Sequence, residues 1–127
     1  MAFEIVIFGH RLPGVSMADF KTYYDTKHMP MIQKMTGKDF PVKHTRRYIE
    51  RPDGENAAVL FGSPADIDFD VIANMVFEDE EAANRFTGIL TTKENAQIIE
   101  EDEKNFFDRN RCKVVKLWGT DILARTE

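Results

Sequence analysis

Residues 23–32, YYDTKHMPMI, combine side chains that can do chemistry within a segment whose flanks predict a helix. A histidine in such a place can be a packed core residue, a metal ligand or an acid–base group. At about 100° per residue, one apolar stripe of this helix consists of Phe20, Tyr24, Met31 and Met35. His28 follows Tyr24 by one turn, at the edge of the stripe, so we expect its ring to point largely inward.

Pro30 disturbs this helix two residues after His28. It has no N–H, so the carbonyl of Thr26 loses its helical partner, and its ring disfavours helical geometry at Met29. The helix is therefore predicted to bend or loosen at His28. A polar, strained place on an apolar face is typical of a functional site. The other reading is an interfacial histidine that satisfies the free carbonyl or a neighbouring tyrosine, and both readings stay open.

A second group of polar side chains alternates along FPVKHTRRYIE, residues 40–50, where a strand is predicted. His44, Arg46 and Tyr48 share one face of this strand with Phe40 and Val42. If that face meets a pocket, His44 and Tyr48 form a second acid–base pair, and Arg46 can hold a carboxylate. Alternatively, the face contacts solvent or a partner subunit.

Two further residues are candidates for ligand contact. His10 ends the first predicted strand, a place often found at the rim of a pocket, although it can equally be a solvated loop residue. Trp118 can be a core residue or an aromatic platform for a ligand. The three histidines lie 18 and 16 residues apart without any spacing typical of metal ligands, so the sequence predicts no metal site.

Composition restricts the class of protein. The chain has 127 residues, 43% of them apolar, so we expect one domain, residues 1–127, with a real core. Its formal net charge of −5 argues against binding to nucleic acid or an anionic membrane. No run is long and apolar enough to predict a membrane span, and the N-terminus lacks a signal-peptide pattern. With a single cysteine, Cys112, these features predict a cytoplasmic protein.

Predicted elements follow one another as strand, helix, strand, strand, helix in two pieces, strand. Capping boxes are expected at Ser16 and Thr91, and Asp79 is expected to cap the first piece of the second helix. The strands are predicted at residues 3–10, 40–50, 69–78 and 112–123. This order is β-α-β-β-α-β, the ferredoxin-like α+β arrangement of an antiparallel sheet with helices on one face. We expect the long excursion 51–66 to be a lid or a hairpin.

The last predicted strand has apolar residues on both faces. Val114 and Trp118 lie on one face, and Val115 and Leu117 on the other. One layer of helices leaves the second face of the sheet uncovered, so we expect that face to be buried against a partner. A second copy of the chain is the simplest partner, which predicts a homodimer.

Two segments resemble the EthD family of the dimeric α/β-barrel superfamily. The helix of these proteins carries a pattern close to Y-Y-x-x-K-H-M-P, which is matched by Tyr23, Tyr24, Lys27, His28, Met29 and Pro30. The segment EDEKNFFDRNRCKVVKLWGTDI is similar to the tail of a fungal group in this family, with Glu103, Phe106, Phe107 and Asp108 in the expected order. The resemblance is least clear over residues 51–66.

The resemblance implies a dimeric barrel with a hydrophobic pocket beside the first helix. It implies cofactor-free tailoring of an aromatic polyketide, by dehydration or decarboxylation first, with oxidation of an anthrone by O₂ as an alternative. His28 would be the general base or acid, since a free imidazole has a pKa near 6.5, and Tyr24 would donate to an enolate oxygen. We expect Phe20 and Met31 to contact the bound aromatic molecule. A non-catalytic carrier of a hydrophobic metabolite, and more remotely a haem protein with His28 as axial ligand, are further alternatives.

Overall fold

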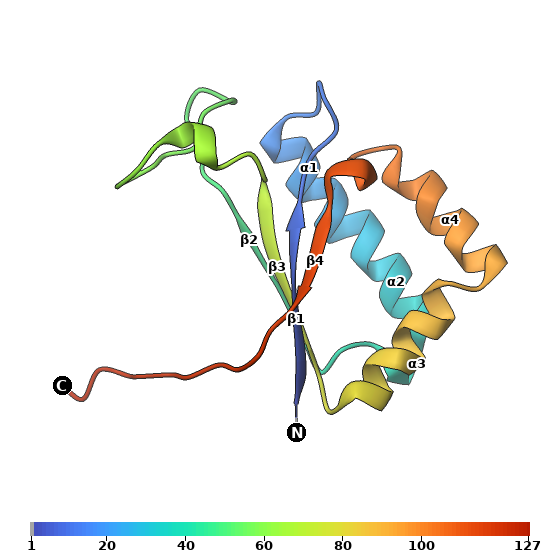
Figure 1. Cartoon of the computed structure of the whole chain (residues 1–127). Helices are drawn as coiled ribbons and strands as arrows, with labels where there is room; N and C mark the ends of the chain where they lie inside the picture. The colour runs from blue at the N-terminus through green and yellow to red at the C-terminus, as the bar shows by residue number, and fades with distance from the viewer. Residues whose placement is uncertain (1) are drawn as a thin grey trace.

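The computed structural model describes residues 2–127 and contains a four-stranded antiparallel sheet with helices on one face (Figure 1). The strands are β1 (Phe3–Gly9), β2 (Lys43–Tyr48), β3 (Val71–Phe77) and β4 (Lys113–Lys116), in the spatial order β2-β3-β1-β4. This confirms the α+β, ferredoxin-like fold, with helices on one face only.

Alternation along β3 separates the two faces of the sheet. Its odd-numbered residues from Val71 to Phe77 are buried beneath the helices, and Ile72, Asn74 and Val76 point to the open face. Val6 of β1 is opposite Asn74 on one side and Val115 of β4 on the other, so it too lies on the open face. The open face thus has an apolar centre that no helix covers.

The helices are α1 (Met17–Tyr23), α2 (Met29–Thr36), α3 (Glu80–Leu90) and α4 (Lys93–Glu103). Two predicted caps are confirmed: the Ser16 hydroxyl accepts from the N–H of Asp19, and the Asp79 carboxylate accepts from the N–H of Ala82. The third prediction was wrong by one residue. Thr92, not Thr91, caps α4, because its side chain reaches the N–H of Asn95.

A π-helical turn, Tyr24–His28, joins α1 to α2 and confirms the loosening predicted at His28. The N–H of Met29 bonds to the carbonyl of Tyr24, five residues earlier. Pro30 explains the wide turn, because its ring would clash with the carbonyl four residues before it in a regular α-helix. α2 then continues to Thr36 and ends at Gly37, which has φ = 53°.

The wide turn also corrects the predicted apolar stripe. A π-turn adds one residue to the helix, so the inward-facing positions after it shift by one. Met29, Ile32 and Thr36 are buried in place of Met31 and Met35, which are only partly buried. A helical wheel with a constant rotation of about 100° per residue cannot predict this shift.

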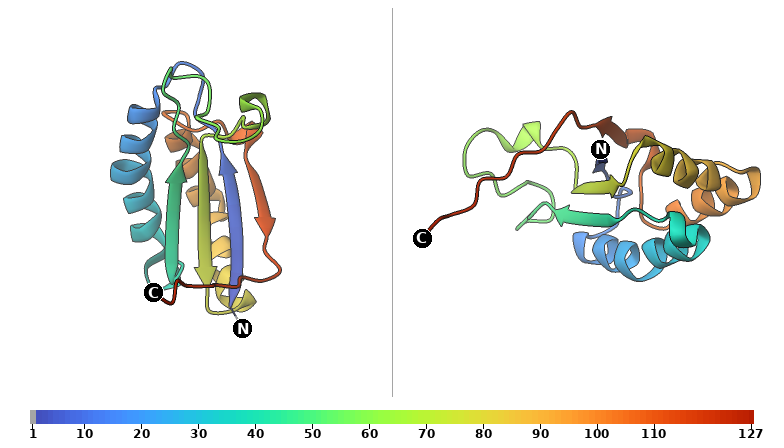
Figure 2. Two further views of the ribbon diagram at one scale, coloured as in Figure 1. Left: turned by 90° about the vertical axis from the view of Figure 1, so that its left-hand side faces the viewer. Right: turned by 90° about the horizontal axis from the view of Figure 1, so that it is seen from below.

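The last strand is shorter than predicted. β4 ends at Lys116, and residues 117–127 leave the sheet as an extended segment on the side of the open face (Figures 1 and 2). Trp118, Ile122 and Leu123 on this segment are fully or almost fully exposed. The predicted strand over 112–123 therefore holds only in its first part, and Trp118 is not a core residue of this chain.

The excursion 51–66 is attached to the sheet by one buried arginine. Arg51, whose side chain is 5% exposed, donates to the carboxylate of Asp70 and to the carbonyls of Glu55, Ile67 and Phe69. Its tip, with exposed Leu60 and Phe61, extends on the same side of the sheet as the C-terminal segment (Figure 1). Across residues 2–127, no helix has both the length and the apolar character needed to cross a bilayer.

Candidate active site

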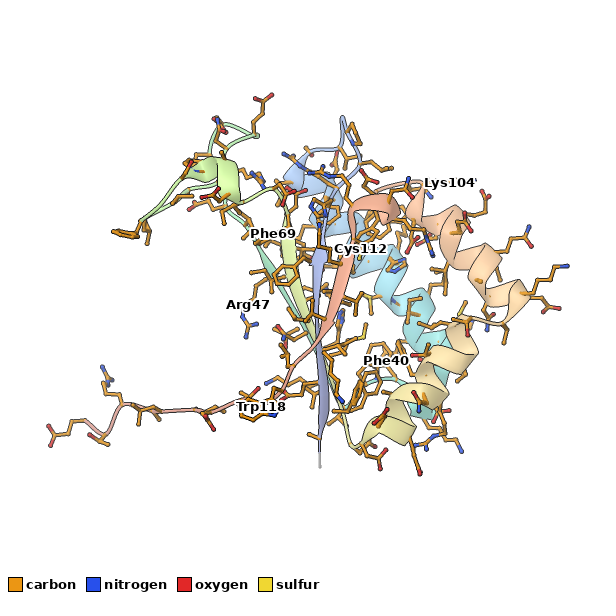
Figure 3. All side chains as sticks on the ribbon, in the orientation of Figure 1. Phe40, Arg47, Phe69, Lys104, Cys112 and Trp118 are labelled. Atoms are coloured by element: carbon orange, nitrogen blue, oxygen red, sulfur yellow. The ribbon has the colours of Figure 1, made fainter. Side chains whose placement is uncertain are left out.

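A pocket of about 360 Å³ lies between the helical layer and the sheet. Its walls come from β1, β3 and β4 on one side and from the π-turn, α2, α3 and α4 on the other. Most of its lining is apolar, and the side chains with chemistry are Tyr24, His28, Glu103, Arg109 and Cys112. In Figure 3, Cys112 lies where the chain enters β4, and Arg47 and Phe69 point away from the helices. The pocket suits a small, largely apolar molecule.

His28 is held in the pocket wall by a carboxylate behind it. Its Nδ1 lies 2.8 Å from Oδ2 of Asp102 on α4, and the two side chains are 12% and 16% exposed. The other carboxylate oxygen of Asp102 accepts from the hydroxyl of Tyr23 at 2.7 Å. Asp102 can only accept, so it selects the tautomer with hydrogen on Nδ1. Nε2 is then the unprotonated nitrogen left for a ligand, and no residue in the range 2–127 bonds to it.

Phe106 packs against this group and limits its orientation. It is fully buried, and its ring centroid lies 5.0 Å from His28, 4.9 Å from Tyr23 and 5.3 Å from Tyr24. Phe20, also fully buried, packs edge-on behind Tyr24 at 5.7 Å. The sequence predicted that Phe20 contacts the ligand, but Phe20 does not line the pocket and instead supports its wall from behind Tyr24.

Tyr24 lines the pocket one turn before His28, and the two rings pack edge to face at 5.7 Å. Burial, followed by the neighbouring Tyr48, raises the pKa of Tyr24 well above its ordinary value, so its hydroxyl keeps its proton at neutral pH. It can thus donate a hydrogen bond to an oxygen that gains charge. The structure brings together His28 and Tyr24, the pair that the sequence predicted.

The structure places His44, Arg46 and Tyr48 elsewhere. They lie on the helix side of edge strand β2 and surround Asp25, whose Oδ1 accepts from Arg46 Nη2 and from the Tyr48 hydroxyl, each at 2.8 Å. Arg46 also contacts Nδ1 of His44 at 2.9 Å. The predicted carboxylate of Arg46 is therefore Asp25 of the same chain, and none of the three β2 residues lines the pocket.

Electrostatic shifts within this β2 group suit a structural role. Burial, then Arg46 and His28, lowers the pKa of His44 to about 4, so its ring is neutral at pH 7. Burial and the hydrogen bond to Asp25 raise the pKa of Tyr48 to about 12. Arg46 and Tyr48 thus join the π-turn to the sheet edge through Asp25, and His44 contacts Arg46.

The remaining predicted contacts also lie outside the pocket. His10 is 1% exposed and hence not a rim residue, and it faces Asp68 at 3.6 Å. Met31 faces α4 beside Ile98 and Asp102 on the outer side of the helices. Trp118 lies on the exposed C-terminal segment (Figure 3). Their placement follows from the π-turn for Met31 and from the early end of β4 for Trp118.

Sequence reasoning missed Asp102, Tyr23 and the pair of Glu103 with Arg109. Asp102 and Glu103 belong to EEDE, residues 100–103, which pattern alone presents as a solvated helix face. Their side chains are only 16% and 14% exposed, since α4 turns this end toward the π-turn and the start of β4. The signal in the sequence that this helix end is buried is the pair of apolar residues Ile99 and Phe106, which flank it and are both buried.

Glu103 and Arg109 form an ion pair in the same pocket, with Arg109 Nε donating to Glu103 Oε1 at 2.6 Å. Burial, followed by the charge of Glu103, raises the pKa of the Cys112 thiol, and Arg109 opposes that shift. Within residues 2–127, no three His, Cys, Asp or Glu side chains are grouped so that they can hold a metal ion.

Solved structures share this fold. An EthD-like protein from Ralstonia eutropha JMP134 is 15% identical, with 98% of this chain and 96% of that chain covered and a TM-score of 0.58. An EthD family protein from Bacillus halodurans C-125 is 16% identical over 96% of this chain and 100% of the other, at a TM-score of 0.54. SnoaB, a cofactor-independent oxygenase from Streptomyces nogalater, is 12% identical, with 98% of this chain and 96% of that chain covered and a TM-score of 0.50. At these identities the likeness establishes the fold.

No curated protein matches the chain significantly. The model of the EthD domain matches residues 12–110, which include the π-turn, His28, Asp102 and most of the pocket wall. This match spans more than half of the chain, and it agrees with the resemblance of the YYDTKHMP segment. The chain therefore belongs to the EthD domain family.

Proposed function

We propose that this protein is a cofactor-free acid–base enzyme that acts on an aromatic small molecule in the pocket beside His28. One observation carries the proposal: a carboxylate holds Nδ1 of His28 at 2.8 Å and leaves Nε2 free at the wall of an apolar pocket. A histidine that is only structural needs no such free nitrogen beside a cavity. Membership of the EthD family supports a small-molecule role.

The chemistry follows from the roles of three side chains. Nε2 of His28 removes a proton from a carbon next to a carbonyl, and Asp102 stabilises the imidazolium that forms. The hydroxyl of Tyr24 donates to the oxygen of the developing enolate. The enolate then expels the β-hydroxyl group, which takes the proton from the imidazolium and leaves as water. The products are the unsaturated carbonyl compound, water and the enzyme in its starting protonation state.

The substrate class and setting are parts of the same proposal. The resemblance of the C-terminal segment to a fungal group supports an aromatic polyketide intermediate as substrate and secondary metabolism as context. Dehydration or decarboxylation are the first reactions to test. The cytoplasm as location and residues 1–127 as one domain belong to the proposal as well.

A second candidate is cofactor-free oxidation, supported by the shared fold with SnoaB, a cofactor-independent oxygenase. In that reaction His28 would generate a carbanion that transfers electrons to O₂, which is consumed as the co-reactant. Dehydration and decarboxylation consume no O₂. An oxygen electrode during turnover therefore distinguishes the two candidates.

We also propose a homodimer formed through the open face of the sheet. That face presents Val6, Ile72, Val76 and Val115 without a helical cover. The excursion, with exposed Leu60 and Phe61, and the C-terminal segment, with exposed Trp118, Ile122 and Leu123, both extend on this side of the sheet (Figure 1). Large exposed apolar groups gathered on one side are typical of an interface.

The function is tested by incubating the protein with aromatic polyketide intermediates and following mass and O₂. His28→Gln should lower kcat at least about 100-fold, because the general base is lost. His44→Gln is the matched control, since this histidine lies outside the pocket, and it should retain activity. Equal activity in wild type and His28→Gln would contradict an acid–base role. If ligands bind to both but none is converted, the protein is a carrier.

A further inference from the structure

The pocket contains a second polar group besides His28 and Tyr24. Glu103 is the last residue of α4, and Arg109 begins the short 3₁₀ turn Arg109–Arg111 that leads into β4. Both residues line the pocket and form an ion pair. The side chain of Glu103 is 14% exposed, and that of Arg109 is 54% exposed. The pair thus lies where the pocket meets solvent.

One hydrogen bond joins the two side chains and leaves both with free capacity. Arg109 donates through Nε, so Nη1 and Nη2 remain as donors, and Oε2 of Glu103 remains as an acceptor. None of these atoms has a partner in the part of the chain that the structure describes. The pair therefore offers an acceptor next to donors while carrying no net charge.

These properties suit one kind of ligand group. A carboxylate would be attracted by Arg109 but would also meet the negative charge of Glu103, whose side chain is only 14% exposed, and this repulsion costs binding energy. A purely apolar edge would leave Oε2 of Glu103 without a hydrogen bond. A neutral hydroxyl can donate to Glu103 and accept from Arg109 at the same time.

We propose that the Glu103–Arg109 pair is a subsite for a neutral hydroxyl group on an aromatic substrate and that it disfavours a carboxylate there. The inference rests on the proposed function, because it takes this pocket as the substrate site. It also separates the first two candidate reactions: a hydroxylated neutral substrate fits dehydration better than decarboxylation.

Three probes that share one bicyclic frame test the subsite: 2-naphthol, 2-methoxynaphthalene and 2-naphthoate. Their dissociation constants are measured at pH 7 by NMR titration of the full-length protein. We expect 2-naphthol to bind roughly tenfold more tightly than the other two, because only its hydroxyl both donates and accepts while remaining neutral. If 2-naphthoate or 2-methoxynaphthalene binds as tightly as 2-naphthol, the subsite is wrong.

Glu103→Gln provides the sharper test, since it removes one negative charge and leaves Arg109 uncompensated. We expect the affinity for 2-naphthoate to rise roughly tenfold relative to that for 2-naphthol. Asp68→Asn is the matched control. Asp68 pairs with Arg111, which belongs to the same 3₁₀ turn as Arg109, and Asp68 lies outside this pocket. The control substitution changes the net charge equally and should leave the preference unchanged.

The two proposals can fail separately. An unchanged preference in Glu103→Gln, with the fold verified by circular dichroism, overturns the subsite even if His28 proves essential for turnover. Conversely, an active His28→Gln variant overturns the proposed catalysis and leaves the hydroxyl preference intact. Failure of the wild type to bind any of the probes counts against the subsite itself.

Discussion

At the scale of single residues, the catalytic proposal depends on Asp102 more than any sequence pattern indicates. The carboxylate accepts hydrogen bonds from both His28 and Tyr23, and these two bonds fix its orientation. The carboxylate also selects the tautomer of His28. Burial, followed by Asp102, raises the pKa of Tyr23, so this hydroxyl remains a donor. We regard Asp102 as a positioning residue because it does not line the pocket.

Asp102→Asn should therefore lower kcat by about 100-fold with little change in KM, because an amide can donate to Nδ1 and stabilise the wrong tautomer. ¹⁵N NMR of the His28 ring reports the tautomer directly. Tyr23→Phe is the control, since it removes the second hydrogen bond to Asp102 and keeps the carboxylate. We expect Tyr23→Phe to lower kcat only a few-fold. A normal kcat in Asp102→Asn would show that His28 does not need this partner.

His44 leads to a prediction on stability and pH. Its folded-state pKa is about 4 and its ordinary value 6.5, so between these values the unfolded chain binds a proton that the folded protein does not. The free energy of unfolding should therefore fall as the pH drops from 6.5 to 4. His10, whose pKa burial also lowers, acts in the same direction.

Urea unfolding of wild type and His44→Gln at pH 7, 5.5 and 4.5 checks this expectation. The variant lacks one of the two groups, so its stability should fall less steeply over this range. Parallel curves for the two proteins would show that His44 is protonated in the fold.

At the scale of elements, one device places the site and another holds the excursion. The π-turn at Tyr24–His28 turns His28 and Tyr24 toward the pocket and Asp25 toward β2, so one turn of helix serves two groups. Arg51 and Asp70 hold the excursion 51–66 against the end of β3, and Arg11 contacts the same carboxylate at 3.4 Å. The ion pairs of Asp70 therefore fix the position of the excursion relative to the start of β3.

Arg51→Met should destabilise the protein by about 3 kcal/mol, because it leaves three carbonyls without their donor and Asp70 with Arg11 alone. Arg85→Met is the control: Arg85 on α3 is exposed, on the helical side, and its one side-chain hydrogen bond is to Asp39 at 3.2 Å. Its effect should stay within about 0.5 kcal/mol. Urea unfolding measures both, and hydrogen exchange should locate the loosening at residues 51–70. Equal stability of the two variants would show that Arg51 does not anchor the excursion.

At the scale of the whole molecule, the layers are asymmetric. Within residues 2–127, one face of the sheet carries the helices and the pocket, and the other has only the excursion and the C-terminal segment on its side (Figure 2). The three exposed large apolar side chains on residues 117–127, which are Trp118, Ile122 and Leu123, are not buried in an isolated chain. A second copy would bury them together with the open face.

Sedimentation velocity tests the dimer. We expect the wild type to sediment as a dimer, and a variant with Trp118→Ser, Ile122→Ser and Leu123→Ser to shift toward the monomer, because the apolar contact is lost. Ile98→Ser is the control, since Ile98 is a half-exposed apolar residue on α4, on the helical side. A monomeric wild type would contradict the proposed interface.

The sequence by itself determined the order of elements, the helical layer on one face, two of three helix caps and the inward direction of His28 and Tyr24. These depend on local periodicity, capping chemistry and Pro30, which act over a few residues. The family followed from a motif within ten consecutive residues, and the matched domain confirms it.

Only the tertiary structure decided which polar groups meet. Asp102 lies 74 residues from His28, and Asp25 lies 21 residues from Arg46, so no local pattern pairs them. The π-turn shifted the buried face by one residue and exchanged Met31 for Ile32. β4 likewise ends at Lys116, opposite Ile5, although β1 continues to Phe3, so the point at which the chain leaves the sheet is a property of the assembled sheet.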